Sequence, residues 1–333
     1  MRKGILERLA EGPVLGDGGY LLELEKRGYV QAGPFTPEVV IEHPDALAQL
    51  HREFLRAGAE VLQTMTFYAS DDKLATVGLE GTVDEINRNA VRIAREVAAE
   101  GEALVAGNIS LTWAYEPADA TSPDHVRALI DRQLHDQLDA GPPDFWIGET
   151  FSYLGEALLF VERAAATGLP VMVTMSFETL PAKADDGDTP GECAKRLAGA
   201  GADVVGVNCL NGPEQQLPIA VEMVRAVGGA VPVAAQPVAY ATTESEPDFT
   251  SWPDFPYALT PMTLPRGDLG RFAADARDAG VRYIGSCCGS VAEHVRAMAK
   301  VLGKLSQRER EWRSPTGRAM SAYEYYAHTE IET

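Results

Sequence analysis

The sequence predicts an α/β protein built as a single (β/α)8 TIM barrel, and two observations lead to this fold. Eight short apolar runs recur along the 333 residues, and helical patterns lie between them. Most of the runs are continuously apolar rather than alternating, as expected of parallel strands covered by helices. No glycine-rich dinucleotide motif follows the first run, which disfavours the alternative of an open, doubly wound sheet.

The elements are predicted in the following order. Strands are expected at 14–17, 60–67, 103–110, 144–150, 170–177, 203–209, 231–237 and 282–288, and helices at 43–59, 82–101, 122–141, 155–168, 189–201, 217–229, 267–280 and 290–305. The first helix has Pro44 in its first turn and ends at Gly58, both common boundary signals. Thr82, with Glu85 three residues later, predicts a capping box at the start of the second.

The chain shows no linker, so we expect one barrel over residues 1–304 and a tail over 305–333. Two polar, proline-rich loops, 181–190 and 242–256, follow strand ends and are expected over the mouth of the barrel. The tail carries the aromatic residues Trp312, Tyr323, Tyr325 and Tyr326. It is expected to pack on the outside of the barrel or to form a homo-oligomer contact.

The composition bounds the partners and the compartment. Lys and Arg total 29 against 49 Asp and Glu, a net charge of -20, which argues against nucleic acid and anionic membranes as partners. No apolar run is long enough to span a membrane, and the first residues lack the apolar core of a signal peptide. Only four cysteines are present, two of them adjacent, which favours a reducing cytoplasm over a disulfide framework.

Polar residues stand at or near the ends of the predicted strands. They are Asp17, Gln63, Asn108, Glu149, Asn208, Cys209, Gln236, Cys287 and Cys288. The carboxyl ends of barrel strands face the active site, where a purely stabilising role would favour apolar side chains. We therefore predict a functional site here, with Gln63 and Asn208 among its substrate-binding residues.

Three of the cysteines predict a metal centre. Cys209 ends the sixth predicted strand and the pair Cys287–Cys288 ends the eighth, so one strand separates them in a closed barrel. Three thiolates leave one tetrahedral position of Zn²⁺ open, the pattern of a catalytic site. The alternative is that cysteines only fill core space, which we expect of Cys193 in an outer helix. Such a zinc ion would hold a substrate thiolate in its ionised form, and methyl transfer is the natural reaction.

Five segments carry a resemblance to a known family. They are residues 16–38, 43–74, 201–209 (GADVVGVNC), 236–240 (QPVAY) and 280–289 (GVRYIGSCCG). The sequence resembles the homocysteine S-methyltransferases, most closely those that use betaine. The resemblance implies that Cys209, Cys287 and Cys288 bind zinc. It also implies that Asp17 and Glu149 receive the ammonium of homocysteine, and that the amides at Gly18 and Gly19 hold its carboxylate.

The resemblance further implies an onium methyl donor, betaine first, with methionine and dimethylglycine as products. Tyr68 matches an aromatic residue of the betaine site, whereas Phe35 stands in place of a Trp and Thr150 in place of a Tyr. Because aromatic faces bind onium groups, these departures keep dimethylsulfoniopropionate or S-methylmethionine open as donors. A homocysteine-binding role beside a separate corrinoid methyl carrier is the other alternative. Candidates for rebuilding the aromatic cage around the onium group are Trp113, Tyr115, Trp146, Phe151 and Tyr153.

The resemblance leaves the oligomeric state open. The betaine enzymes of animals carry a C-terminal extension that helps to assemble the oligomer. This chain has only the short aromatic tail in the corresponding region.

Overall fold

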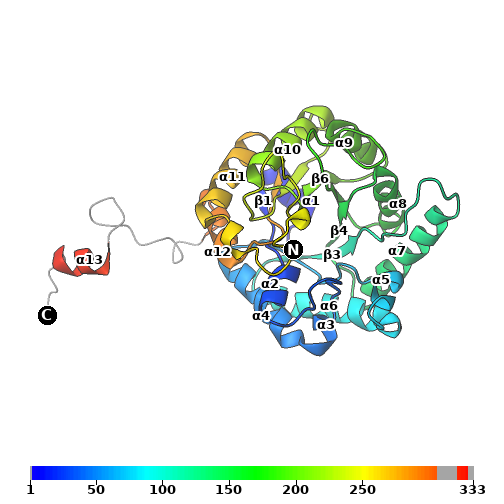
Figure 1. Cartoon of the computed structure of the whole chain (residues 1–333), viewed down its shortest axis with the longest axis horizontal. Helices are drawn as coiled ribbons and strands as arrows, with labels where there is room; N and C mark the ends of the chain where they lie inside the picture. The colour runs from blue at the N-terminus through cyan, green and yellow to red at the C-terminus, as the bar shows by residue number, and fades with distance from the viewer. Residues whose placement is uncertain (1, 306–320, 329–333) are drawn as a thin grey trace.

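The computed structural model describes residues 2–305 and 321–328, and its eight strands form one parallel sheet wrapped into a barrel (Figure 1). Strand order in the sheet is β1-β8-β7-β6-β5-β4-β3-β2. A hydrogen bond from the amide of Glu60 to the carbonyl of Leu15 (2.9 Å) joins the first strand to the start of the second. The helices surround the sheet, so the predicted (β/α)8 fold is confirmed.

The strands are β1 (Val14–Leu15), β2 (Val61–Gln63), β3 (Leu104–Ser110), β4 (Phe145–Phe151), β5 (Val171–Met175), β6 (Val204–Asn208), β7 (Val233–Gln236) and β8 (Tyr283–Ile284). The helices are α1 (Ile5–Glu11), α2 (Leu21–Lys26), α3 (Val39–Glu42), α4 (Pro44–Ala57), α5 (Asp71–Ala75), α6 (Val83–Ala98), α7 (Ser122–Asp139), α8 (Leu154–Ala165), α9 (Pro190–Gly199), α10 (Pro213–Val227), α11 (Arg266–Asp278), α12 (Ala292–Val301) and α13 (Ala322–His328). Short 3₁₀ turns are η1 (Glu80–Thr82), η2 (Phe249–Ser251) and η3 (Thr260–Met262).

All eight predicted strands are present, but β1 and β8 have only two residues each. Asp17 and the Cys287–Cys288 pair therefore lie in the loops beyond these strands. Helix α10 begins at Pro213, four residues before the predicted start, because it accommodates Pro218 in its interior.

The predicted capping box at Thr82 is wrong. The Thr82 hydroxyl donates back to the carbonyl of Leu79 (2.8 Å) within η1, so it caps no amide of α6. A capping box is found instead at the start of α9, where the Thr189 hydroxyl accepts from the amide of Glu192. The carboxylate of Glu192 in turn accepts from the amide of Thr189 (2.8 Å).

The interior of the barrel is apolar near the amino ends of the strands and polar near their carboxyl ends. One buried cluster unites the inward positions nearer the amino ends with α1: Ile5, Leu9, Val14, Val61, Leu104, Ala106, Phe145, Ile147, Met172, Val204, Ala234 and Tyr283. Helix α1 therefore closes the amino-terminal end of the barrel. Two residues further along, or four in β6, the same faces carry Gln63, Asn108, Glu149, Asn208 and Gln236. Because side chains repeat with period two, these polar groups face the same interior.

The two long loops lie at the carboxyl-terminal end of the barrel, as predicted. In the loop after β7, the ring of Phe255 packs against Phe35 from the loop after β1, with ring centroids 5.8 Å apart. In the loop after β5, the carboxylate of Asp186 accepts from the amides of Leu154 and Gly155 at the start of α8.

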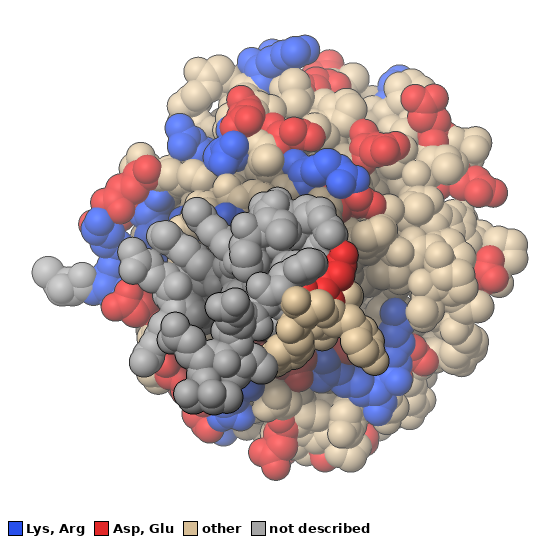
Figure 2. Space-filling model, turned by 90° about the vertical axis from the view of Figure 1, so that its left-hand side faces the viewer, with Lys and Arg blue, Asp and Glu red and all other residues tan. Residues whose placement is uncertain are grey.

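The surface carries both signs of charge. On the face in Figure 2, Asp and Glu are interspersed with Lys and Arg over the described residues. None of the helices described is long and apolar enough to cross a membrane.

The role of the tail stays a prediction. In α13, Tyr323 and Tyr326 are 90% and 65% exposed, and Trp312 lies outside the described residues.

Close packing of β6 on β7 generates a stability prediction. A Cβ on Gly206 would lie 2.2 Å from the carbonyl oxygen of Ala234, a backbone atom that cannot move without separating the strands. We expect Gly206→Ala to lower the free energy of unfolding by about 2 kcal/mol or more, as overpacking does. The control is Gly199→Ala at the end of α9, where a Cβ meets nothing within 4 Å. Denaturant unfolding of both variants checks this, and equal stability of the two would contradict it.

Candidate active site

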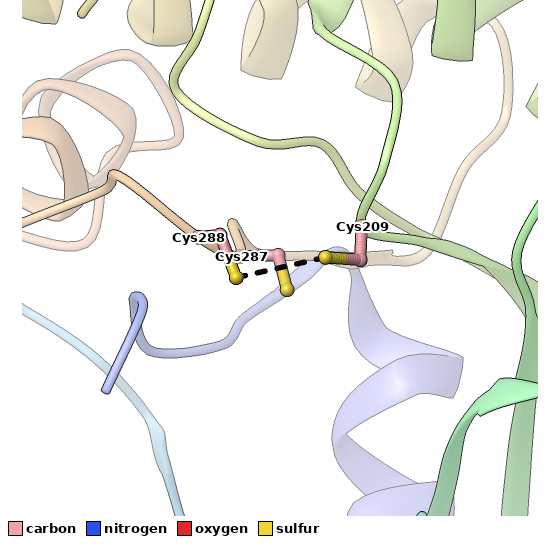
Figure 3. A group of neighbouring side chains, drawn as sticks. All are labelled: Cys209, Cys287 and Cys288. Atoms are coloured by element: carbon pink, nitrogen blue, oxygen red, sulfur yellow. Dashed lines mark hydrogen bonds between the residues drawn. The ribbon is translucent and has the colours of Figure 1, made fainter. Parts of the chain in front are cut away.

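The sulfur atoms of Cys209, Cys287 and Cys288 meet at the mouth of the barrel (Figure 3). All three lie within 4.8 Å of one another, and 3.6 Å separates those of Cys209 and Cys288. Cys209 directly follows β6, and the other two lie in the loop after β8. The structure thus brings together residues that are 79 positions apart in sequence.

The segment that continues β7 holds this cluster in place from between its neighbours. The amide of Cys209 donates to the carbonyl of Gln236 (2.9 Å), and that of Cys287 donates to the carbonyl of Pro237 (2.8 Å). The carbonyl of Cys288 accepts from Ala239 (2.9 Å). Backbone hydrogen bonds therefore fix both cysteine segments to one intervening strand.

Local backbone conformation aims the thiols. Cys209 has a left-handed φ of 58°, unusual for a residue with a side chain, and Gly289 follows the cysteine pair with φ 76°. A Cβ on Gly289 would lie 2.5 Å from the ring of Tyr240, so this turn also requires glycine for space. Gly285, which precedes the cysteine pair, has no left-handed φ.

The geometry fits a shared metal ion. All three cysteines are free, and 3.6 Å is far too long for a disulfide bond. Sulfurs bound tetrahedrally at a Zn–S distance of about 2.3 Å would be roughly 3.8 Å apart. The pKa of Cys209 lies well below the usual thiol value, because its thiolate accepts hydrogen bonds from Cys287 and then Cys288. The pKa values of Cys287 and Cys288 lie well above the usual thiol value, because each hydrogen-bonds to the Cys209 thiolate.

A small cavity of about 80 Å³ opens beside the sulfurs. It is lined by Asp17, Gly18, Gly19, Tyr20, Leu21, Gln63, Thr64, Met65, Phe67, Glu149, Thr150, Cys209, Gln236, Ser286, Cys287 and Cys288. Most of the residues predicted for the site therefore line one cavity. A Cβ on Gly19 would lie 2.7 Å from the carbonyl oxygen of Cys287, so the close approach of the loop that carries Cys287 requires glycine at position 19.

Glu149 lies in the cavity wall, surrounded by three side-chain amides. Its Oε1 accepts from Gln63 (2.6 Å) and Asn108 (2.7 Å), and its Oε2 accepts from Asn208 (3.3 Å). Burial nevertheless raises the pKa of Glu149 to about 8, and the neighbouring thiolate of Cys209 adds to the rise. This carboxylate is therefore poised to gain from a positive charge placed in the cavity.

Asp17 is held by a chain of hydrogen bonds that the sequence did not reveal. Its Oδ2 accepts from the hydroxyl of Tyr20 (2.5 Å) and the amide of Gln63 (2.8 Å). The Tyr20 oxygen also lies 3.0 Å from Nδ1 of His51. Since the single Tyr20 proton goes to the carboxylate, Nδ1 of His51 must donate to Tyr20. Burial raises the pKa of Asp17 to about 6 and lowers that of His51 to about 3, so His51 is neutral.

The only sequence signals for Tyr20 and His51 were their positions. Tyr20 directly follows the DGG turn, and His51 is the one ionisable residue on the buried face of α4. Asn208, also predicted to bind substrate, is fully buried behind Glu149. Its Oδ1 accepts from the amide of Thr150 (2.9 Å), so it supports the wall of the cavity.

Phe35 and Tyr68, which were predicted to bind the methyl donor, are not among the residues that line this cavity. Phe35 packs against Phe255, and Tyr68 accepts a hydrogen bond from the indole of Trp113 (3.1 Å).

Two of the five candidate cage residues are excluded. Trp146 is fully buried and donates to Thr167, and Phe151 packs on Phe160 of α8. Trp146 lies at an outward position of β4. Phe151 would face inward by alternation, but the pairing of β4 with β5 shifts register between Gly148 and Phe151, where Thr150 has a left-handed φ of 64°, so its ring packs against α8 instead. Tyr115 and Tyr153 pair with each other, with ring centroids 5.5 Å apart.

Comparisons with known proteins agree with this geometry. The family model for homocysteine S-methyltransferase matches residues 14–302. The chain belongs to the homocysteine S-methyltransferase family. The family predicted from the sequence motifs is therefore confirmed.

Several relatives resemble this family member over most of its length. Betaine–homocysteine S-methyltransferase 1 from Bos taurus is 42% identical over 99% of this chain and 86% of its own, and that from Danio rerio is 46% identical over 90% and 76%. S-methylmethionine–homocysteine S-methyltransferase BHMT2 from Pongo abelii is 42% identical over 90% and 82%. The homocysteine methyltransferase MmuM from Escherichia coli, in its metallated form, shares the fold with a TM-score of 0.69 at 22% identity, over 89% of this chain and 99% of its own.

Asp17 generates a pH-dependent stability prediction. The substituted side chain in Asp17→Asn keeps a carbonyl oxygen to accept from Tyr20 and Gln63 but carries no charge. Because the pKa is raised to about 6 from 3.8, the native state binds more protons than the unfolded chain between these values, and stability falls as pH rises through them. Metal-free Asp17→Asn should therefore exceed the wild type by about 2 kcal/mol at pH 7.5 and match it near pH 4.

Thermal unfolding at both pH values measures this difference. Asp254→Asn, which neutralises an exposed loop carboxylate, is the control and should match the wild type at both. A less stable Asp17→Asn at pH 7.5 would contradict the assignment of Asp17 as a buried charge.

Proposed function

We propose that this protein transfers a methyl group from an onium donor, betaine first, to the sulfur of L-homocysteine. The products are methionine and, from betaine, dimethylglycine. The observation that carries the proposal is that one cavity is lined both by the three thiols and by the buried carboxylates of Asp17 and Glu149. That layout suits a substrate with a thiol at one end and an ammonium at the other.

The metal is proposed to be Zn²⁺, held by Cys209, Cys287 and Cys288. Three thiolate ligands suit zinc, and their spacing supports this assignment. When bound, the ion would leave one coordination position for the sulfur of homocysteine and keep that sulfur ionised at neutral pH. Free thiols also suit a reducing compartment, which supports the cytoplasm as the place of action.

The carboxylates are proposed to bind the amino-acid end of homocysteine. A substrate ammonium beside Asp17 and Glu149 lowers both raised pKa values, because an opposite charge favours the ionised carboxylate. Gly18 and Gly19 line the same cavity, and the amide of Gly18 is proposed as the donor for the substrate carboxylate, because that of Gly19 already donates to the carbonyl of Ser290 (3.2 Å). Gln63 bridges the two acids, since its amide nitrogen donates to Asp17 and its side chain donates to Glu149.

The transfer itself is a displacement. The homocysteine sulfur forms a bond to the methyl carbon while the bond from that carbon to the donor nitrogen breaks. The electron pair stays on the nitrogen, which becomes a neutral tertiary amine. The residues of the cavity act by orienting the two substrates and excluding water, which together lower the barrier of a two-substrate displacement.

A sulfonium donor is the second candidate. Relatives named for betaine are 42% and 46% identical to this chain and one named for S-methylmethionine is 42% identical, so overall similarity separates the two donors only slightly, in favour of betaine. Phe35 and Thr150 still mark the donor region as distinctive. With a sulfonium donor, the same displacement would release a neutral thioether.

The metal assignment predicts which cysteines matter. Cys209→Ala and Cys288→Ala each remove one of three ligands, so we expect loss of most bound zinc and at least a 100-fold fall in methionine formation. Cys193→Ala removes a buried thiol of α9 and should retain the wild-type zinc content. Elemental analysis of the purified proteins gives the metal content independently of turnover. Full zinc occupancy in Cys209→Ala would refute the site.

The donor assignment predicts methionine from zinc-loaded protein, homocysteine and betaine without any corrinoid. A panel of betaine, dimethylsulfoniopropionate and S-methylmethionine is compared, with methionine and the demethylated product quantified by mass spectrometry. Equimolar methionine and dimethylglycine would support betaine. Activity with a sulfonium alone would move the donor to the second candidate, and no activity with any donor would favour the corrinoid-carrier alternative.

A further inference from the structure

A lysine ammonium is clamped between two aromatic rings beside the barrel mouth. Nζ of Lys73, in α5, lies 4.8 Å from the ring centroid of Tyr68 and 4.7 Å from that of Trp113. The indole nitrogen of Trp113 donates to the Tyr68 hydroxyl (3.1 Å), which locks the two rings together. Both distances are within the range of favourable cation–π contacts.

The backbone at both rings is strained in the same way as at the metal site. Six described residues other than glycine have a left-handed φ: Phe35, Tyr68, Trp113, Thr150, Cys209 and Leu210. All six follow or end strands at the carboxyl-terminal side of the barrel. Trp113 is 65% exposed, so burial of its ring does not account for its strained backbone. Such strain tends to gather at functional sites, which groups Trp113 and Tyr68 with the thiol-bearing Cys209.

The cluster is electrostatically linked to the thiols. The pKa of Tyr68 is raised to about 12, mainly by burial, with added contributions from the charges of Cys209, Cys288 and Glu156. Glu156 is buried, and its carboxylate already accepts from the amide (2.7 Å) and the hydroxyl (2.6 Å) of Thr112. It attracts Lys73 from a distance without an ion pair.

The positive charge of Lys73 has no anionic partner among the described residues. Within residues 2–305 and 321–328, its ammonium forms neither an ion pair nor a hydrogen bond. A half-buried ammonium is costly without an anionic partner. Because it already covers these faces of Tyr68 and Trp113, it would repel an onium group placed on them.

We propose that Lys73, positioned by Tyr68 and Trp113, binds the carboxylate of the methyl donor and so turns its onium end toward the three thiols. This inference rests on the proposed function and specifies the donor as an onium carboxylate. The two charges of such a donor must face opposite ways, one toward the thiolate sulfur and the other toward a cation. Lys73 supplies that cation at the outer side of the site.

The test compares Lys73→Met, which keeps the length of the side chain without its charge, with Lys73→Arg, which keeps the charge. In the zinc-loaded full chain, Lys73→Met should raise the KM for betaine at least 10-fold, with the KM for homocysteine within about 2-fold of the wild type. Lys73→Arg should stay within about 3-fold for both. Lys183→Met, which removes an exposed charge from the 181–190 loop, is the control and should resemble the wild type.

Two probes separate the carboxylate from the cation. The compound 3,3-dimethylbutanoate has the shape of betaine and its carboxylate but no positive charge, whereas choline has the cation and no carboxylate. Calorimetry on homocysteine-loaded protein should show that Lys73→Met binds 3,3-dimethylbutanoate at least 10-fold more weakly than the wild type does. The variant should bind choline no more weakly than the wild type does.

Unchanged or tighter binding of 3,3-dimethylbutanoate to Lys73→Met would overturn the proposal, because Lys73 would then only occupy the rings until a donor displaces it. Calorimetry needs no turnover. If the wild type makes no methionine, the proposed function fails, and the carboxylate role of Lys73 is still decided by the binding of the two probes.

Discussion

Closure of the parallel sheet into a barrel is the constraint on which the site depends. On every strand, residues of one parity face the axis, so polar side chains at inward positions near the carboxyl ends must meet. Gln63, Asn108 and Asn208 thus come from three strands and converge on the carboxylate of Glu149. The same closure lays the continuation of β7 between the two cysteine segments, where its backbone holds both.

The site is built from features that do not stabilise the protein. Two acids are buried with raised pKa values, and several mouth residues adopt left-handed backbone conformations. Neither feature improves packing, and the raised pKa values show that both carboxylates lack a positive charge beside them. A substrate ammonium beside Asp17 and Glu149, or a dication among the thiols, would relieve part of the cost of burying them. Residues that favour substrate binding therefore lower the stability of the protein without substrate.

The sequence was most informative where the chemistry is rare and least informative where contacts are remote. Three cysteines at two strand ends predicted a cluster that the fold assembles, and the motifs around them predicted the family. Thr82 carried the signature of a cap but bonds within a preceding turn. Trp146 and Phe151 were plausible cage residues by type, yet both face the surrounding helices, Trp146 from an outward position of β4 and Phe151 after a register shift in the pairing of β4 with β5. A shift of one residue along a strand reverses the side that its side chain faces.

The sequence by itself determined the barrel, the family and the thiols that come together, because periodic apolar runs and unusual residue types act locally. The tertiary structure decided what surrounds them. Only the packing of α4 against the loop after β1 places His51 behind Tyr20 and Asp17, and only the adjacency of β2 and β3 brings Trp113 to Tyr68 and Lys73. These contacts depend on the positions of elements in three dimensions, which no local pattern of residues encodes.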